Sequence, residues 1–173
     1  LIEISSDQLL ETLSSLIEQS GGGNILLPTD PRFSKALLSD LEEKYPKQLH
    51  YWKEGNEYRE ENIKHAEEAN IVIAHANFLL AESASIVVET SPGQGRALHF
   101  LPTHYISLIK KSSIVPRSTQ AAAYYADKIE QGDPVGSAIH FISGPSNSGD
   151  IEMQLVVGLH GPLKMYYVVL EDL

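Results

Sequence analysis

The stretch NIVIA at residues 70–74, followed by SIVVE at residues 85–89, decides the fold class. Both runs are short, apolar and rich in β-branched residues, as strands buried on both faces of a sheet are. Similar runs occupy 103–109 and 163–170. Helical patterns separate such runs over short connections, and this alternation is typical of a mostly parallel sheet with helices on both faces. The sequence therefore predicts an α/β fold.

The rest of the chain extends the same pattern in both directions. Further strands are expected at 24–27, 48–52 and 137–143, and helices at 5–20, from Asp30-Pro31 to Leu41, at 56–69, from about Arg96, at 118–131 and at 150–157. Ser5 with Gln8 resembles a capping box, and Gly132 ends the helix before it. No internal repeat or linker interrupts the pattern, so one domain over 1–173 is expected.

Composition excludes several classes of site and partner. The 173 residues include no Cys and carry a formal net charge of −10. A disulfide framework, a thiolate metal site and a cysteine nucleophile are therefore excluded, and the seven histidines show no metal-binding spacing. The negative charge argues against a nucleic-acid or membrane partner. No apolar run approaches the ~20 residues of a membrane span, so a cytoplasmic location is expected.

The first candidate ligand loop is SPGQGR at residues 91–96, directly after the strand at 85–89. Its glycines allow a tight turn that brings backbone N–H groups close to an anion, and Arg96 can pair with a carboxylate or phosphate. The alternative is a turn that leads into the next helix. On the ligand reading the binding residues are Ser91, Gly93, Gln94, Gly95 and Arg96.

The second candidate loop is SGPSNS at residues 143–148, after a strand that ends at Ile142 and before a helix expected to open at Asp150. Hydroxyls and amides at a helix N-terminus favour an anion site, although Ser148 can equally be a helix cap. Ligands of open α/β sheets bind beyond the carboxyl ends of the strands, at the topological switch point, and both loops are expected at that edge. The binding residues of this loop are Ser143, Gly144, Ser146 and Ser148, with Asp150 as a catalytic candidate.

Two carboxylates flank the strand at 85–89. Glu82 and Glu89 are each open to two readings, a general base or nucleophile with a raised pKa, or a paired or solvated side chain. The paired or solvated reading is the commoner one for such a residue. Separately, Ser91 and Ser146 lack the GxSxG context of a hydrolase nucleophile, so a hydrolase triad is unsupported.

Linked motifs resemble one family. The stretches LAESASIVV at 80–88, SPGQGR at 91–96 and Leu101-Pro102 resemble the central signature of the LUD-domain family, the lactate utilisation protein C (LutC/YkgG) proteins. The resemblance resumes with SGPSNSGDIE at 143–152 and LVVGLHGP at 155–162.

The resemblance implies a fold similar to the NagB/RpiA/CoA-transferase superfamily. It also implies a place in a cytosolic three-protein system that oxidises L-lactate to pyruvate. Iron–sulfur clusters are then expected on the partner subunits, and no cofactor is expected in this chain. The family's N-terminal helical extension is expected to be mostly absent.

One position departs from the family. The family's stretch AETGT is AESAS here, so Ala84 stands where the family has Gly. If that glycine serves a positive φ, Ala84 strains the turn. The superfamily's CoA-transferases carry a nucleophilic Glu in a similar setting, which makes Glu82 a catalytic candidate by analogy of fold alone.

Three functional hypotheses follow. The leading one is a LutC-like subunit of L-lactate oxidation that binds a small carboxylate or phosphate between the two glycine-rich loops. The second is a scaffold without ligand that docks an iron–sulfur protein, in which case Arg96 is expected to pair internally with Glu89 or Asp150. The third is a CoA- or acyl-transferring enzyme that uses Glu82.

Overall fold

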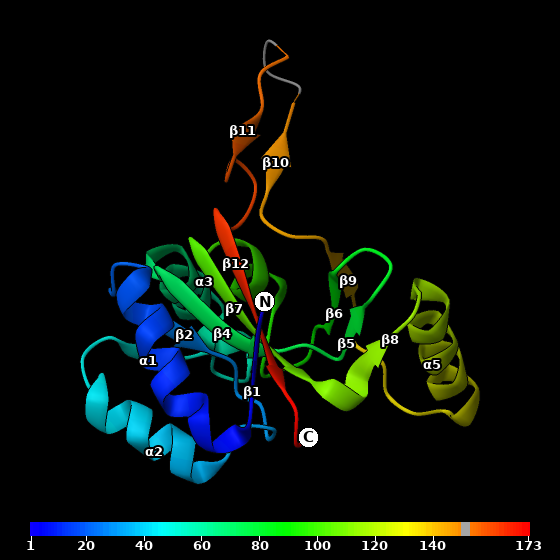
Figure 1. Ribbon diagram of the computed structural model, residues 1–173, viewed down its shortest axis with the longest axis horizontal. Coiled ribbons are helices and arrows are strands. Elements are labelled where there is room, and N and C mark those ends of the chain that lie inside the picture. Colours follow the sequence, from blue (N-terminus) through cyan, green and yellow to red (C-terminus); the bar gives the residue numbers. More distant parts are fainter. Residues whose placement is uncertain (150–152) are drawn as a thin grey trace.

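The computed structural model describes residues 1–149 and 153–173. Its central sheet has six strands, all parallel (Figure 1). In spatial order these are β1 (Ile2–Ile4), β12 (Lys164–Leu170), β7 (His104–Lys110), β4 (Ile71–His75), β2 (Ile25–Leu27) and β3 (Leu49–Tyr51). The parallel pairing confirms the α/β class predicted from the alternating pattern.

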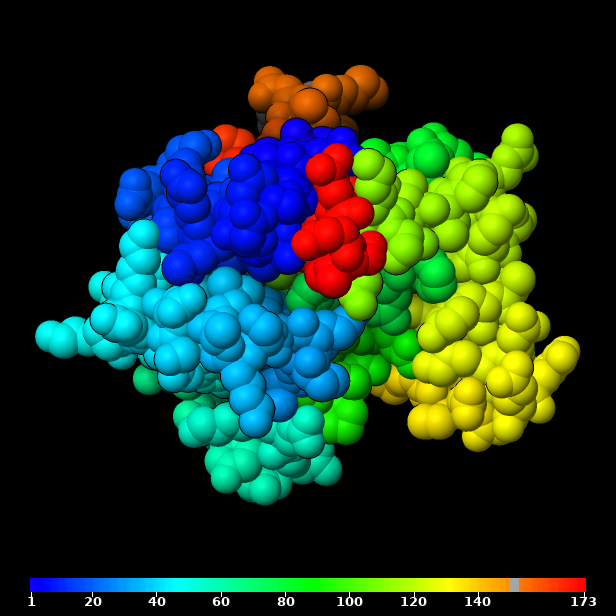
Figure 2. Space-filling view, turned by 60° about the horizontal axis from the view of Figure 1, so that its bottom comes forward, coloured from blue at the N-terminus to red at the C-terminus, as the bar shows by residue number. Residues whose placement is uncertain are grey.

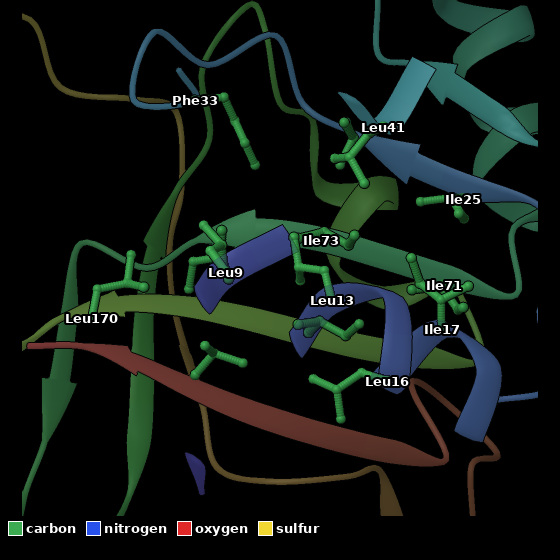
Figure 3. Packing of buried hydrophobic residues seen from close by; sticks show 14 of the residues in the cluster. Leu9, Leu13, Leu16, Ile17, Ile25, Phe33, Leu41, Ile71, Ile73 and Leu170 are labelled. Carbon is green, nitrogen blue, oxygen red and sulfur yellow. The ribbon is translucent and has the colours of Figure 1, made fainter. Parts of the chain in front are cut away.

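Helices cover both faces of this sheet. Helices α1 (Leu9–Gln19) and α2 (Lys35–Lys44) pack on one face, and α3 (Arg59–Glu68) and α4 (Arg96–Phe100) on the other. Alternate residues of β4 divide between the two layers, since Ile71 and Ile73 face α1 whereas Val72 and Ala74 face α3. Figure 3 shows the first layer, in which Leu13 and Ile17 of α1 lie over Ile71 and Ile73. Each such buried side chain stabilises the fold by about 2 kcal/mol.

A smaller sheet stands beside the second face. It contains β8 (Ile114–Val115), β5 (Phe78–Leu80), β6 (Ser85–Glu89) and β9 (Ile139–Ile142), in that order. Strands β5 and β8 are parallel, whereas the other pairs are antiparallel. Helix α5 (Ser118–Gln131) packs on this sheet through Ala121 and Tyr125 (Figure 1).

The two ends of the chain lie side by side, as Figure 2 shows. Strand β1 pairs with β12, and the Ser6 N–H donates to the Asp172 carboxylate over 3.0 Å. Three 3-10 turns complete the regular structure, at Ser6–Gln8, Asn56–Tyr58 and Lys111–Ser113. None of the described helices is both long and apolar enough to cross a bilayer.

The helix predicted from Asp30-Pro31 begins four residues late. Helix α2 starts at Lys35, and its cap is Ser34, whose side chain accepts a hydrogen bond from the Leu37 N–H. The Asp30 carboxylate instead accepts from the N–H of Arg32 and pairs with its guanidinium. A stronger local partner therefore takes Asp30 out of the capping role.

The helix predicted at 150–157 is wrong where the structure describes it. Val156–Val157 form strand β11, antiparallel to β10 (Asn147–Ser148), and Met153 has a φ of +58°. Asp150, the predicted start, lies outside the described residues. Residues 143–149 and 153–163, which include β10 and β11, form an arm that projects from the body (Figure 1).

Strands β5 and β8 have no counterpart among the predicted elements. The predicted strands at 85–89 and 137–143 exist as β6 and β9, but they pair antiparallel in the small sheet rather than join the parallel one. Because of that pairing, their carboxyl ends lie at opposite ends of the strand pair.

Candidate functional site

The chain changes direction across the central sheet between β2 and β4. After β2 it moves outward to β3, whereas after β4 the next strand of this sheet is β7, on the opposite side. The carboxyl ends of β2 and β4 therefore flank the topological switch point, where open α/β sheets bind ligands. A cleft of about 560 Å³ opens there, between the central sheet and α5. This switch-point cleft is lined by Thr29–Arg32, Ala76–Phe78, Glu89, Ser91, Gln94, Lys110, Ser112, Ser113, Tyr124 and Lys128.

Arg32 forms one wall of the cleft and is fully engaged. Its Nε donates to Asp30, and Nη2 pairs with the same carboxylate over 2.6 Å. Nη1 donates to the Ala76 carbonyl (3.1 Å) and to Asn77 Oδ1 (3.3 Å), and Nη2 also reaches the His75 carbonyl (3.2 Å). Burial raises the pKa of Asp30, but the hydrogen bonds and charge of Arg32 outweigh it and hold that pKa below its usual value. Arg32 thus positions the end of β4 rather than offering a free cation.

Two lysines supply the cations on the other side of the cleft. Lys110, at the end of β7, makes no ion pair within the described chain. Lys128 of α5 lies 3.5 Å from Glu89 Oε2, with its Nζ 5.8 and 5.9 Å from the ring centres of Tyr124 and Tyr125. The cleft thus contains three cations, counting Arg32, against the carboxylates of Asp30 and Glu89. A net positive cleft in a chain of charge −10 favours a small anion.

Glu89 lies where two clefts meet. Its side chain is 13% exposed, and Oε1 accepts the Gly136 N–H over 2.5 Å. Oε2 lies 3.4 Å from Asn77 Nδ2, and Asn77 in turn donates to the Tyr125 hydroxyl over 2.9 Å. Besides the switch-point cleft, Glu89 lines a second cleft of about 840 Å³ between the loops at 89–96 and 134–138. Of the two readings for this carboxylate, the structure shows the paired one.

The first glycine-rich loop packs against the ends of β2 and β3. The Ser91 and Gln94 N–H groups donate to each other's carbonyls, which makes a tight two-residue turn. A Cβ on Gly93 would lie 2.1 Å from the Thr29 carbonyl oxygen, and one on Gly95 would lie 2.2 Å from the Trp52 ring. Close packing therefore requires both glycines. The turn reading of this loop is correct, while Ser91 and Gln94 also line the switch-point cleft.

Gln94 and Arg96 differ in how they are held. Gln94 is buried, and its Nε2 donates to the Glu89 carbonyl over 2.8 Å, while its Oε1 accepts no hydrogen bond from the described residues. Arg96 is exposed and makes no ion pair with any described residue, although Glu89 is near enough to line the same cleft. Of the two internal partners that the scaffold hypothesis predicts for Arg96, Glu89 pairs with Lys128 instead, and Asp150 lies outside the described residues.

The second glycine-rich loop does not face the first. Ser143 adjoins the start of β6, where its hydroxyl hydrogen-bonds that of Ser85, whereas Ser91 follows the end of β6. Four residue steps of an extended strand separate these ends by about 13 Å. An anion held between the two loops is therefore contradicted by the antiparallel pairing.

Residues of the second loop anchor the projecting arm. The Gly144 N–H donates to the Tyr167 hydroxyl (3.2 Å), and Ser146 Oγ accepts the His160 N–H (3.2 Å). Ser148 pairs with Val156 in the hairpin. With no helix after it in the described part, this loop lacks the N-terminal dipole on which the anion hypothesis rested.

Glu82 lies on the surface and lines none of the clefts above. Its Oε1 accepts the Ser118 N–H over 2.7 Å at the start of α5, and this hydrogen bond lowers the pKa of Glu82. The neighbouring Ala84 has a φ of +52°, so the position where the family has Gly does require the left-handed region. Because it caps α5 and lies outside the clefts, Glu82 is a poor candidate for a nucleophile.

The sequence analysis did not identify Arg32, Lys110 or Lys128. A usable signal exists for the first two, because each follows the end of a buried strand, at the sheet edge where ligands bind. Lys128 lies in a surface helix and no local pattern marks it. In the described residues, no group of three or more acidic or histidine side chains could hold a metal ion.

Comparisons with known proteins agree with the motifs. The model of the LUD domain family matches residues 2–170. Lactate utilization protein C of Geobacillus thermodenitrificans is 46% identical over 175 residues, covering 99% of this chain and 72% of the relative. The Bacillus subtilis protein of the same name is 44% identical over 174 residues with the same coverage. These matches confirm the resemblance inferred from the sequence.

A solved structure supports the fold. The crystal structure of a DUF162 family protein from Deinococcus radiodurans superposes with a TM-score of 0.61 at 15% sequence identity. The alignment covers 98% of this chain and 86% of that chain. At this identity the likeness concerns the α/β architecture alone.

Proposed function

The chain belongs to the LUD domain family, and from this premise we propose that it serves lactate utilisation by binding a small carboxylate in the switch-point cleft. The relatives that match almost the whole chain are named lactate utilization protein C. The ligand class we propose is a 2-hydroxy or 2-oxo acid such as lactate or pyruvate.

The observation that carries this proposal is the unpaired cation at the switch point. Lys110 is half-buried at the carboxyl end of β7 and makes no ion pair within the described chain. A bound carboxylate would accept a charge-assisted hydrogen bond from this ammonium group. Lys128 lines the same cleft, and Ser91 and Ser112 add hydroxyls for the remaining polar atoms of the ligand.

The sequence offers no thiolate for an iron–sulfur cluster of its own. Thiolates bind most iron–sulfur clusters, and the chain has no Cys. We therefore propose that iron–sulfur subunits act as partners and that this chain holds the carboxylate for them, in the cytoplasm where lactate and pyruvate occur as metabolites.

A second role, partner docking, is favoured by the projecting arm. Leu155 is 72% exposed, and Val157 and Leu159 are also exposed on the same arm. Exposed apolar side chains gathered on one segment are typical of protein–protein contacts. This role is compatible with carboxylate binding, because the arm leaves the body at the end of β6 opposite to Ser91.

Binding of lactate and pyruvate to the isolated chain tests the proposal. Titration calorimetry is expected to give saturable binding that weakens at least tenfold in Lys110→Met and Lys128→Met, since each removes a charge-assisted hydrogen bond. Lys47→Met, at an exposed position away from the cleft, is the matched control. Equal affinity of all four proteins, or no binding by any of them, would exclude the switch-point cleft as the carboxylate site.

A further inference from the structure

A groove between α3 and α4 is separate from the switch-point cleft. It has a volume of about 440 Å³ and is lined by Arg59 and Ile63 of α3, Arg96 and Phe100 of α4, and Trp52. None of these residues lines the switch-point cleft. The volume falls within the range of small-molecule sites.

Two arginines flank this groove and make no ion pair within residues 1–149 and 153–173. Arg59 and Arg96 are both exposed, and neither makes an ion pair with a described residue. The chain holds 23 acidic residues against 13 lysines and arginines, so acidic partners are abundant. Other cations find them, as Lys53 does with Glu61 over 2.7 Å. Within the described chain, both guanidinium groups of this groove are therefore available to an anionic ligand.

Arg96 also occupies a position that disfavours a cation. It is the first residue of α4, whose first turn contains no acidic residue, and the helix macrodipole places partial positive charge at that end. Arg59 is the first residue of α3, where Glu60 and Glu61 in the same turn offset its charge.

The walls of the groove are apolar and aromatic. Trp52 is 9% exposed and forms part of the buried layer over the sheet, and Phe100 packs against the same layer. Ile63 adds an aliphatic surface from α3, and Leu101 is 43% exposed next to the groove. A ligand that fits this groove has an apolar planar part as well as an anionic part.

We propose that the α3–α4 groove binds a nucleoside phosphate. The phosphate lies between the guanidinium groups of Arg59 and Arg96, whose planar forks match phosphate geometry. The base lies against Trp52 and Phe100, since aromatic side chains provide large apolar contact areas. This site is independent of the carboxylate site.

Calorimetric titration of the wild-type chain with AMP and ADP tests the proposal directly. Saturable binding is expected, with adenosine and inorganic phosphate each binding at least tenfold more weakly, because each lacks one half of the contacts. Arg59→Gln and Arg96→Gln are each expected to weaken AMP binding about tenfold or more, the effect of one charge-assisted hydrogen bond. Lys35→Gln is the matched control, as it removes a cation from the first residue of α2, away from the groove.

Each outcome decides the proposal. The absence of any binding of AMP or ADP by the wild-type chain overturns it without recourse to variants. Binding of inorganic phosphate as tight as that of AMP overturns the nucleoside assignment, and an equal loss in Lys35→Gln overturns the assignment of the two arginines. Without ligand, the two arginine variants are expected to unfold at or above the wild-type temperature, which shows that lost binding is not lost folding. Unchanged lactate binding in Arg59→Gln separates this site from the carboxylate site.

Discussion

The guanidinium of Arg32 donates to the main-chain carbonyl of Ala76, with 3.1 Å between Nη1 and the oxygen. This hydrogen bond joins the loop after β2 to the end of β4, the two strands that flank the switch point. The same guanidinium pairs with Asp30, whose side chain is 6% exposed. The switch-point cleft therefore has a wall held by one charged side chain.

Arg32→Ala is expected to lower the free energy of unfolding by about 3 kcal/mol, because it leaves the buried Asp30 carboxylate without its cation. Urea unfolding measures the change. Asp30→Ala is expected to be destabilising too, and the double variant is expected to lose clearly less than the sum of both, as contacting partners do. Additive losses would show that the two side chains act independently.

The fold was predictable where the local pattern and the tertiary structure agree. Runs such as 70–74 are buried on both faces, and Gly132 ends α5 in the left-handed region as expected. Asp30 shows where such agreement fails. It was expected to cap a helix, but Arg32, only two residues away, binds its carboxylate instead. The hairpin formed by β10 and β11 shows a second limit, because two-residue strands carry no periodicity.

The candidate site was predictable only in part. Ser91 and Gln94 do line the switch-point cleft, since they follow a strand and precede a helix. The loop at 143–148 was misplaced because the pairing direction of β6 and β9 is a long-range property that neither strand encodes alone. Lys128 reaches the site from α5 through tertiary packing, which no spacing in the sequence reveals.

The free energy of unfolding is expected to decrease as the pH is lowered from 6.5 to about 4. Burial, together with the charge of Arg32, lowers the pKa of His75 to about 4, and burial with the charge of His140 lowers that of His99 to about 3. The unfolded chain binds protons on both residues near pH 6.5 and the folded chain does not, so unfolding is favoured as the pH falls. Between pH 7 and pH 5, each of the two histidines is expected to lower the free energy of unfolding by about 2 kcal/mol.

Urea unfolding of His75→Gln at pH 7 and pH 5 measures this contribution. The variant is expected to lose less stability between these two pH values than the wild type does, whatever its stability at pH 7. His99→Gln is expected to show the same reduction, because its ring is fully buried. A pH dependence identical to that of the wild type in both variants would contradict the assignment.

Gly93→Ala is expected to destabilise the fold by about 3 kcal/mol, since the added Cβ would overlap the Thr29 carbonyl and force the loop at 91–96 away from β2. Thermal unfolding measures the loss, and binding of the carboxylate is expected to weaken as Ser91 and Gln94 move. Gly149→Ala is the control, because a Cβ there meets nothing within 4 Å. A neutral Gly93→Ala would mean that the loop does not pack as described.

Ala84→Gly is expected to stabilise the protein by about 0.5–1 kcal/mol, as relief of the left-handed strain exceeds the added entropy of the unfolded chain. The sign is informative, since the same change in an exposed helix costs about 1 kcal/mol. Ala122→Gly in α5 provides that comparison. Differential scanning calorimetry of both variants measures the two changes in stability. Destabilisation by Ala84→Gly would contradict the positive φ of Ala84.

Glu82→Ala separates a capping role from a catalytic one. The side chain is exposed and accepts the Ser118 N–H, so its removal is expected to lower the unfolding temperature slightly while lactate-dependent growth is unchanged. Because the hydrogen bond lowers the pKa of Glu82, the difference in stability from the wild type is expected above pH 4.5 and to vanish as the pH falls through the lowered value. Thermal unfolding at pH 7 and at a series of lower pH values below 4.5 checks this. Loss of growth with an unchanged unfolding temperature would instead restore Glu82 as a catalytic residue and with it the acyl-transfer hypothesis.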